Sequence, residues 1–554
     1  MSNAAQRIAD LSPEEKRALL AKLLRKEAGE SQSFQPLSYN QQGIWFLYQL
    51  APESMVYNVN FAARIRSDVD IPALRRAFQA LVDRHPALRT TFSVRSGKPA
   101  QRVHQQLAVH FVEIDASAWD SEVLKTRLLE EAYRPFDLER GPVLRVNLFN
   151  RSAKDRVLLL VVHHIVIDFW SLALLLTELG VLYPAEKAGV KALLPALDSQ
   201  YTDYVRWQAE MLAGSEGERL WAYWRKQLAG QLPLLELPTD RPRPPVPTYR
   251  GASCDFQLDD QLSARLRAFA KAQGATLYMV LLAAFQVILH HHTGQEDLLV
   301  GSPVLGRSRA EFEGIVGLFT NPVILRANCS GNPTFEAFLG QVRQTVLAAL
   351  EHQDYPTLLL VERLHPARDL SRPPLCQVMF VLDKPHQLAE KGAPAFVLGE
   401  SGLRMNPGGL ELEALPLEHR AATLDLVMLT IETAHSLSVS IRYNSDLFDA
   451  ATIARIAKHF ETLLHHVTSQ PNTRLDALRD ILAAMDRQQL AAIRQQYKEA
   501  DLQRLKAARR IAISVSQPGS DGAKGYGTPR QSGDRPHLHL NGTSPGSKSR
   551  AGNG

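Results

Sequence analysis

Apolar and polar residues along this chain follow two periods, one typical of strands and one of helices. The unbroken apolar run 157–162 predicts a buried central strand, because a strand covered on both faces is apolar at every position. Ser171 then opens a helical pattern over residues 172–183. The same succession of strand and amphipathic helix, such as 56–65 followed by 71–82, predicts a mixed α/β fold.

This alternation predicts two lobes of similar kind. It extends over residues 34–212 and resumes over residues 213–475, with a proline-rich link at 237–247 just inside the second stretch. A chain of 554 residues also exceeds what one hydrophobic core usually supports. We therefore expect two α/β lobes, the first of which contains the strand at 157–162.

A separate helix is expected in the N-terminal segment 1–33. Ser12 and Glu15 form a capping box around Pro13, and the leucines that follow make one apolar stripe. Such a helix either packs on the main body or serves as a docking element for the tail of a preceding protein.

The C-terminal part of the chain changes character after about residue 475. Residues 476–512 have the pattern of an increasingly basic helical linker. Residues 513–554 are rich in Gly, Ser and Pro and have almost nothing apolar to bury, which predicts a disordered tail.

Composition excludes several classes of function. The net charge of +5 is mild for this length, so no nucleic-acid partner is expected. Cys254, Cys329 and Cys376 are widely spaced, which favours reduced thiols over a disulfide framework or a zinc site, and we expect no metal. No stretch reaches 18 apolar residues, so we expect no membrane span and a cytoplasmic protein.

The end of the strand at 157–162 carries the candidate chemistry. His163 and His164 follow it directly, and Asp168 comes four residues after the second histidine. Successive strand residues point to opposite faces, so both histidines cannot reach the same reacting atom. We expect one histidine to act chemically and the other to be structural.

Seven segments together resemble the condensation domains of nonribosomal peptide synthetases, members of the HHxxxD acyltransferase superfamily. The string HHIVID resembles that signature, and the other segments match the family in order over about residues 35–375. They are LSYNQQGIW at 37–45, RHPALRTTF at 84–92, HHIVID at 163–168, YTDYVRW at 201–207, VGLFTNPVILR at 316–326, HQDYP at 352–356 and RDLSRPPL at 368–375.

The resemblance implies a fold and an activity. The two lobes would be chloramphenicol-acetyltransferase-like and form a V with a central active-site tunnel. The reaction would be amide-bond formation between an acyl or peptidyl thioester on a donor carrier protein and the amine of an aminoacyl group on an acceptor carrier. The chain itself would bind no cofactor, since both substrates are held on phosphopantetheine of the carriers, and a preceding synthase could dock at the N-terminal helix.

The resemblance also assigns roles to residues. His164 matches the functional histidine, His163 is expected to be structural, and Asp168 is expected to pair with Arg307 in a salt bridge that supports the fold. Candidates for lining the tunnel are Phe169, Trp170, Ser171 and Asn321, although a purely structural role for Asn321 is equally supported.

One position departs from the family pattern. Phe169 stands where the family usually has glycine, so its ring either turns into the core or narrows the tunnel beside His164. We favour the core, because the flanking residues are apolar. The string Asp-Phe-Trp-Ser is similar to condensation domains of hybrid polyketide–peptide assembly lines, which favours an acyl or polyketide donor.

Other functions remain open at this point. A starter-type domain that N-acylates with a fatty acyl donor and a non-catalytic recruitment domain are the main alternatives, although the intact histidines and aspartate argue against the latter. Epimerisation, heterocyclisation and free coenzyme A chemistry are less well supported by the motifs. The donor group, the acceptor amino acid and its stereochemistry are not specified by any motif.

Overall fold

The computed structural model describes residues 34–366, 369, 371–383, 402–432, 436–488 and scattered positions up to 499. The helix expected at 12–27, the tail 513–554 and most of the basic linker 476–512 fall outside these residues. Contacts divide the chain into two units, Met1–Ala484 and Met485–Gly554. The architecture below is that of the first unit.

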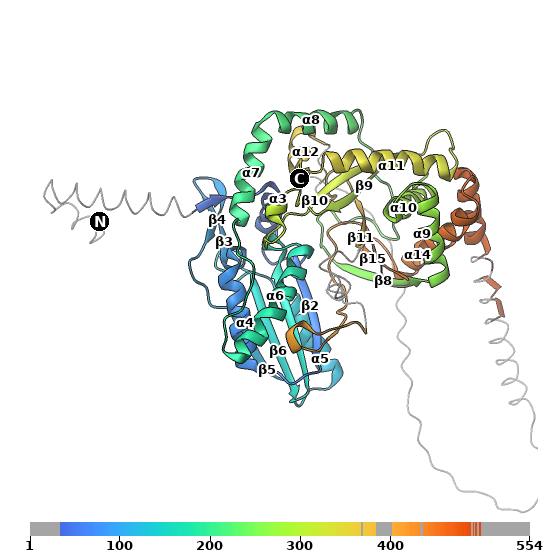
Figure 1. The fold of residues 1–554 in the computed structure, drawn as a ribbon. Helices are drawn as coiled ribbons and strands as arrows, with labels where there is room; N and C mark the ends of the chain where they lie inside the picture. Colours follow the sequence, from blue (N-terminus) through green and yellow to red (C-terminus); the bar gives the residue numbers. More distant parts are fainter. Residues whose placement is uncertain are drawn as a thin grey trace, which may run out of the picture. The chain divides into compact units, whose positions relative to one another are not determined.

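The first lobe is built on a six-stranded sheet in the order β12-β13-β2-β7-β6-β5, in which only β5 and β6 run parallel. The central strand β7 is buried at every position from Val157 to His163, which explains its unbroken apolar run. Helices α4 and α6 lie side by side against this sheet (Figure 1). The elements are β2 Asn58–Ile65, α4 Ile71–Arg84, β5 His110–Asp115, α5 Ser121–Ala132, β6 Leu144–Ser152, β7 Asp155–His163 and α6 Phe169–Ala188.

A small antiparallel sheet accompanies this lobe. Its strands run in the order β1-β4-β3, and the helix that follows β1 begins at a capping box in which Ser38 and Gln41 exchange hydrogen bonds. The elements are β1 Phe34–Pro36, α3 Tyr39–Leu50, β3 Thr90–Arg95 and β4 Lys98–Val103.

The second lobe repeats the arrangement with another six-stranded sheet, in the order β10-β9-β11-β14-β15-β8. Helices α9, α10 and α14 gather against one another beside this sheet (Figure 1). The strands are β8 Gly251–Leu258, β9 Asp297–Val304, β10 Asn321–Asn328, β11 Val378–Asp383, β14 Leu426–Glu432 and β15 Leu437–Asn444. The helices are α7 Tyr201–Ala213 and α8 Ser215–Gln227, which lead into the lobe, then α9 Asp260–Ala272, α10 Leu277–Thr293, α11 Phe335–Glu351, α12 Thr357–Leu364 and α14 Ala450–Ser469.

The prediction of two α/β lobes is confirmed, but the second stretch does not stay in its own lobe. Strands β12 (Arg404–Met405) and β13 (Leu412–Ala414) cross over and extend the first sheet, where β13 pairs antiparallel with Ala63–Ile65 of β2. Residues 312–319 also contribute apolar side chains to the first core. The boundary predicted at 212/213 therefore does not separate the two cores.

The end of the second lobe is also later than predicted. Residues 475–488 are helical, and Leu475, Leu478 and Leu482 are buried in the second core. The segment expected to begin a linker at residue 476 thus packs as part of the lobe for its first two turns. Its apolar stripe faces the core, while the basic residues that suggested a linker come later.

Two further expectations from composition concern the cysteines and the membrane. Cys254, Cys329 and Cys376 are all free thiols. Within the described ranges, no individual helix has the length and apolar character of a membrane span, although the bent pair α9 and α10 reaches that threshold when taken together.

The crossover is fastened by a tight turn against helix α6. Gly408 has a φ of 61°, and a Cβ placed there would lie 2.2 Å from the carbonyl oxygen of Gly180. Gly409 also has a positive φ of 91°, but a Cβ there would meet nothing within 4 Å. The two neighbouring glycines therefore separate backbone strain from steric exclusion.

We expect Gly408→Ala to destabilise the protein more than Gly409→Ala. Positive φ costs alanine roughly 1–2 kcal/mol at either position. The clash with the α6 backbone adds about 1–3 kcal/mol at Gly408 alone. Urea denaturation of the two variants measures the difference, and equal losses would show that the turn does not press on α6.

Candidate active site where strand β7 meets helix α6

The candidate site lies at the turn between β7 and α6. The strand ends at His163, a single 3-10 turn spans His164–Val166, and α6 begins at Phe169 with Asp168 as its N-cap. The helix thus begins two residues before Ser171, where the apolar periodicity placed its start. The reason is that the Asp168 side chain accepts a hydrogen bond from the Ser171 backbone N–H, which is standard N-cap geometry.

His163 is enclosed and serves the backbone of the turn. Its side chain is 4% exposed, and Nδ1 accepts a hydrogen bond from the backbone N–H of Ile165 at 3.2 Å. The ring of Phe136 meets it edge-on, with 5.8 Å between ring centroids. Burial, helped by His164 and Arg145, lowers the pKa of His163 to about 3, so the ring is neutral near pH 7.

His164 lies in the turn itself and is only half-buried. Its Nδ1 is 2.5 Å from the carbonyl oxygen of Ile167. A carbonyl oxygen only accepts, so Nδ1 donates and the neutral ring carries its lone pair on Nε2. The backbone of the turn therefore fixes the tautomer that accepts a proton or hydrogen bond at Nε2.

The carboxylate of Asp168 is saturated with hydrogen bonds. It is 1% exposed, and Oδ1 accepts from the backbone N–H of Ser171 at 2.8 Å and from its hydroxyl at 2.6 Å. Oδ2 accepts from the backbone N–H of Phe319 at 3.1 Å. The remaining bonds come from Arg307, at 2.5 Å to Oδ2 and 3.2 Å to Oδ1.

Arg307 is equally enclosed, with 3% of its side chain exposed. Besides the two bonds to Asp168, it donates to the Ser171 hydroxyl at 2.8 Å and to the carbonyl oxygen of Ile315 at 3.0 Å. The guanidinium also lies over the ring of Phe319, 4.0 Å from its centroid, in a cation–π contact. Bidentate geometry and full desolvation make this a strong but demanding pair.

Two opposing effects set the charge of Asp168. Burial raises the pKa of the carboxyl, but the charge and hydrogen bonds of Arg307, with those of Ser171, outweigh burial and lower it below the ordinary value. Asp168 is therefore ionised at neutral pH. Its role here is to hold charge and geometry rather than to exchange protons.

A second set of contacts binds the segment after Arg307 to the first lobe. Tyr201 donates to the carbonyl oxygen of Leu318 at 2.6 Å and lies 2.8 Å from the Ser38 hydroxyl. Asn40 donates to the carbonyl oxygen of Thr320 at 3.0 Å. Gln41, fully enclosed, donates to the carbonyl oxygen of Ile165 and so reaches the histidine turn directly.

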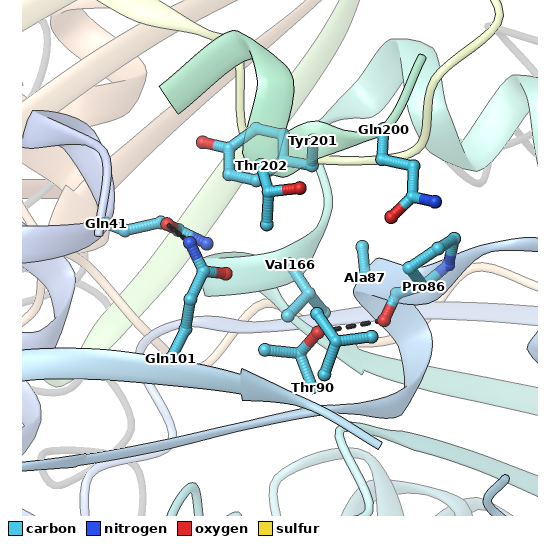
Figure 2. A pocket seen from close by; sticks show the side chains of 10 residues that line it. Gln41, Pro86, Ala87, Thr90, Gln101, Val166, Gln200, Tyr201 and Thr202 are labelled. Carbon is cyan, nitrogen blue, oxygen red and sulfur yellow. Dashed lines mark hydrogen bonds between the residues drawn. The ribbon is translucent and has the colours of Figure 1, made fainter. Parts of the chain in front are cut away.

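A small cavity lies behind the histidine turn, lined by Val166, Gln41, Gln101 and Tyr201 among others (Figure 2). Gln41 and Gln101 point toward each other across it. Its volume of about 10 Å³ is near the minimum for one water molecule. The cavity is thus too small for an acyl or aminoacyl substrate, and His164 is absent from its lining.

Comparison with known proteins identifies the family to which this fold and site belong. The model of the condensation-domain family matches residues 31–491, more than four-fifths of the chain. The chain belongs to the condensation-domain family. The resemblance carried by the seven sequence segments is therefore confirmed.

Individual relatives agree with this assignment. The condensation domain is 41% identical over 440 residues to a part of the linear gramicidin synthase of Brevibacillus parabrevis, covering 79% of this chain and 6% of that protein. It is 37% identical over 445 residues to the chondramide synthase of Chondromyces crocatus, covering 79% of this chain and 11% of that protein. The chain therefore spans only a small fraction of the length of these relatives.

Solved structures agree on the fold. The X-domain from teicoplanin biosynthesis is 28% identical, with a TM-score of 0.72 and coverage of 80% of this chain and 96% of that one. The condensation domain of the Monacolin K polyketide synthase matches with a TM-score of 0.68 at 20% identity, covering 80% of this chain and 99% of that chain. The second likeness concerns the fold alone.

Within this condensation domain, two residues predicted to line a tunnel are enclosed instead. Ser171 is 0% exposed and belongs to the Asp168 and Arg307 network. Asn321 is 4% exposed, and its amide donates to the carbonyl oxygens of Gln353 and Tyr355 and accepts from Thr357. Both polar groups are used within the protein, so neither is left for a substrate.

The other two candidates lie at the edge of the first core. Phe169 is half-buried and packs against that core, which is the position favoured from its apolar neighbours. Trp170 is also half-buried, and its indole N–H donates to the carbonyl oxygen of Glu313 at 2.8 Å. Trp170 thereby adds another link between α6 and the segment after Arg307.

Sequence reasoning missed three contributors to the site. Ser171 bridges both partners of the ion pair, Tyr201 anchors the segment at Leu318, and the carbonyl oxygen of Tyr57 accepts from the backbone N–H of His164. Ser171 and Tyr201 stood inside recognised strings, but a string does not show which atom a hydroxyl contacts. No pattern in the sequence distinguishes Tyr57 from other strand-edge tyrosines.

We expect Asp168→Ala and Arg307→Ala each to lower the free energy of unfolding by about 3–5 kcal/mol, because each leaves a buried charge without its partner. The double variant should lose clearly less than the sum of the two single variants, since both changes remove one shared pair. Urea denaturation at matched conditions measures all four proteins. Additive losses would mean that the pair is not coupled.

We also expect His163 to make stability fall as the pH is lowered. Unfolded His163 takes up a proton near its ordinary pKa of about 6.5, whereas the folded protein resists protonation until about pH 3. Its contribution is therefore complete above about pH 6.5 and declines progressively as the pH approaches 3.

The matched variant for this test is His163→Asn, which keeps an acceptor for Ile165 but does not titrate. Urea midpoints at pH 7 and pH 5 should fall less for the variant than for the unaltered protein. His292 and His419 have similarly lowered pKa values and are present in both proteins, so the difference isolates His163. Parallel declines would contradict the assignment.

Proposed function

We propose that this condensation domain forms an amide bond between a carrier-bound acyl or peptidyl thioester and the amine of a carrier-bound aminoacyl group. The single observation that carries the proposal is the fixed tautomer of His164, with Nδ1 bound to Ile167 and the lone pair left on Nε2. Membership of the condensation-domain family and likeness to linear gramicidin synthase support it.

The reaction needs a proton acceptor and a held geometry. The amine nitrogen attacks the thioester carbonyl carbon, a C–N bond forms, the C–S bond breaks, and the phosphopantetheine thiol leaves. The amine loses one proton during this exchange, and the leaving thiolate gains one. Nε2 of His164 accepts the proton or a hydrogen bond from the attacking amine, an effect worth roughly a hundredfold to ten-thousandfold in rate.

Asp168 and Arg307 are positioning residues in this proposal. They pin the N-terminus of α6 to the segment after Arg307, and α6 follows the histidine turn directly. The turn therefore has little freedom, and His164 holds one orientation. Preorganised geometry of this kind lowers the entropic cost of bringing two carrier-bound substrates together.

The partners proposed are a donor and an acceptor carrier protein that present phosphopantetheine thioesters. The chain matches only a small fraction of each much longer relative, which supports carriers supplied by other domains or proteins. A docking role for the N-terminal helix at 12–27 stays a prediction. So does the preference for an acyl or polyketide donor that the string after Asp168 suggested.

We expect His164→Ala to reduce condensation by roughly two to four orders of magnitude while the protein stays folded. The assay supplies donor carriers loaded with varied acyl groups and acceptor carriers loaded with varied amino acids. Mass spectrometry of the carrier-bound products then measures the rate and identifies the preferred substrates. Far-ultraviolet circular dichroism checks the fold of each variant.

The control is His465→Ala, which removes an exposed histidine on α14 without touching the histidine turn. This variant should form product at the unaltered rate. Product formation by His164→Ala at the control rate would contradict a role for Nε2 in proton transfer. A loss confined to one donor length would instead assign His164 to substrate positioning.

A second candidate function is recruitment of a partner protein without catalysis. It is favoured by the likeness to the teicoplanin X-domain, which has also been solved as a complex with OxyB. The same assay distinguishes the two functions. A folded protein that yields no amide with any loaded pair, yet binds a partner enzyme, would favour recruitment.

A further inference from the structure

Three histidines from two helices meet in the second lobe, away from the residues of the candidate active site. His291 and His292 lie at the end of α10, and His459 lies in the middle of α14. The two helices pack against each other and contribute to the second core. No pattern in the sequence indicated this cluster, because His292 and His459 are 167 residues apart.

The geometry of the cluster suits a metal ion. One ring nitrogen from each histidine lies within 4.8 Å of the other two. Nε2 of His292 and Nδ1 of His459 are 3.2 Å apart. Two imidazole nitrogens that bind Zn²⁺ at roughly 2.0–2.1 Å in tetrahedral geometry are separated by about 3.4 Å, so this pair is already spaced as ligands.

Burial and exposure are divided in a way that permits entry of an ion. His459 is 0% exposed and forms the floor of the cluster, whereas His291 and His292 are half-buried and lie toward solvent. The ring of His459 stacks on that of His292 and meets that of His291 edge-on. Only small rotations of the two outer rings are needed to bring all three nitrogens together.

The charge state of the cluster also favours metal binding. A metal needs neutral imidazole, and burial, assisted by His291, His459 and Arg455, lowers the pKa of His292 to about 3. Near pH 7 this ring therefore presents a lone pair instead of a second proton. Arg455, one turn before His459, adds positive charge that opposes a cation and so disfavours ions that bind imidazole weakly, such as Mg²⁺ and Ca²⁺.

We propose that His291, His292 and His459 form a three-histidine site for a divalent transition metal, of which Zn²⁺ is the ion to test. The ion would take three imidazole nitrogens and complete its tetrahedron with water. Bound there, it joins the end of α10 to α14 and stabilises the second lobe. This site is independent of the condensation reaction, which uses none of its residues.

The test measures zinc on tag-free protein that has first been stripped with a chelator. Equilibrium dialysis with metal analysis should find one zinc per chain, and Zn²⁺ should raise the melting temperature because it binds the folded state. Co²⁺ in place of Zn²⁺ should give the visible absorption of a tetrahedral site. His291→Ala and His292→Gln should each weaken zinc binding at least tenfold and abolish the thermal shift.

The matched control is His465→Ala, since His465 is exposed on the same helix but outside the cluster. It should bind zinc and shift in melting temperature like the unaltered protein. His291 is only half-buried, so its variant remains folded even if changes at His459 do not. Zinc binding that survives His291→Ala and His292→Gln, or the absence of any binding by the unaltered protein, would reduce the cluster to a hydrogen-bonded packing contact.

Discussion

A carboxylate held away from water must be met by an opposite charge, and in this fold the requirement is satisfied by Asp168 and Arg307. The two residues are 139 positions apart in the chain, yet each is almost wholly enclosed. Burying such a pair is costly unless every remaining hydrogen-bonding position is filled. Ser171, Phe319 and Ile315 fill those positions, which ties α6 of the first lobe to a segment that precedes β10 of the second.

The histidine turn depends on this arrangement. Asp168 is both a member of the ion pair and the N-cap of α6, so the start of the helix is fixed in space and not only in sequence. The turn between β7 and α6 is then held at both ends, by strand pairing on one side and by the capped helix on the other. In that short span the backbone of Ile167 sets the tautomer of His164 and the backbone of Ile165 engages His163.

Local sequence determined the elements and the chemistry of the condensation domain. The apolar run at 157–162 became the buried part of β7, and the helical pattern after it became α6, because periodicity reflects which faces are covered. The paired histidines, the aspartate and its arginine partner were readable from strings similar to a known family. Such strings carry residue identity and order, which is enough to name the family and to propose roles.

Tertiary structure decided everything that depends on atoms brought together from distant positions. The sequence placed residues 404–414 with the second lobe, but the open edge of β2 accepts β13 and carries the crossover into the first sheet. It also offered Ser171 and Asn321 as tunnel walls, whereas the fold uses their polar atoms internally. The three-histidine cluster arises in the same way, since helix packing brings residues 291, 292 and 459 together and no local pattern records that meeting. Hydrogen-bond saturation and burial are properties of the assembled core, so the sequence by itself could name these residues but not assign their contacts.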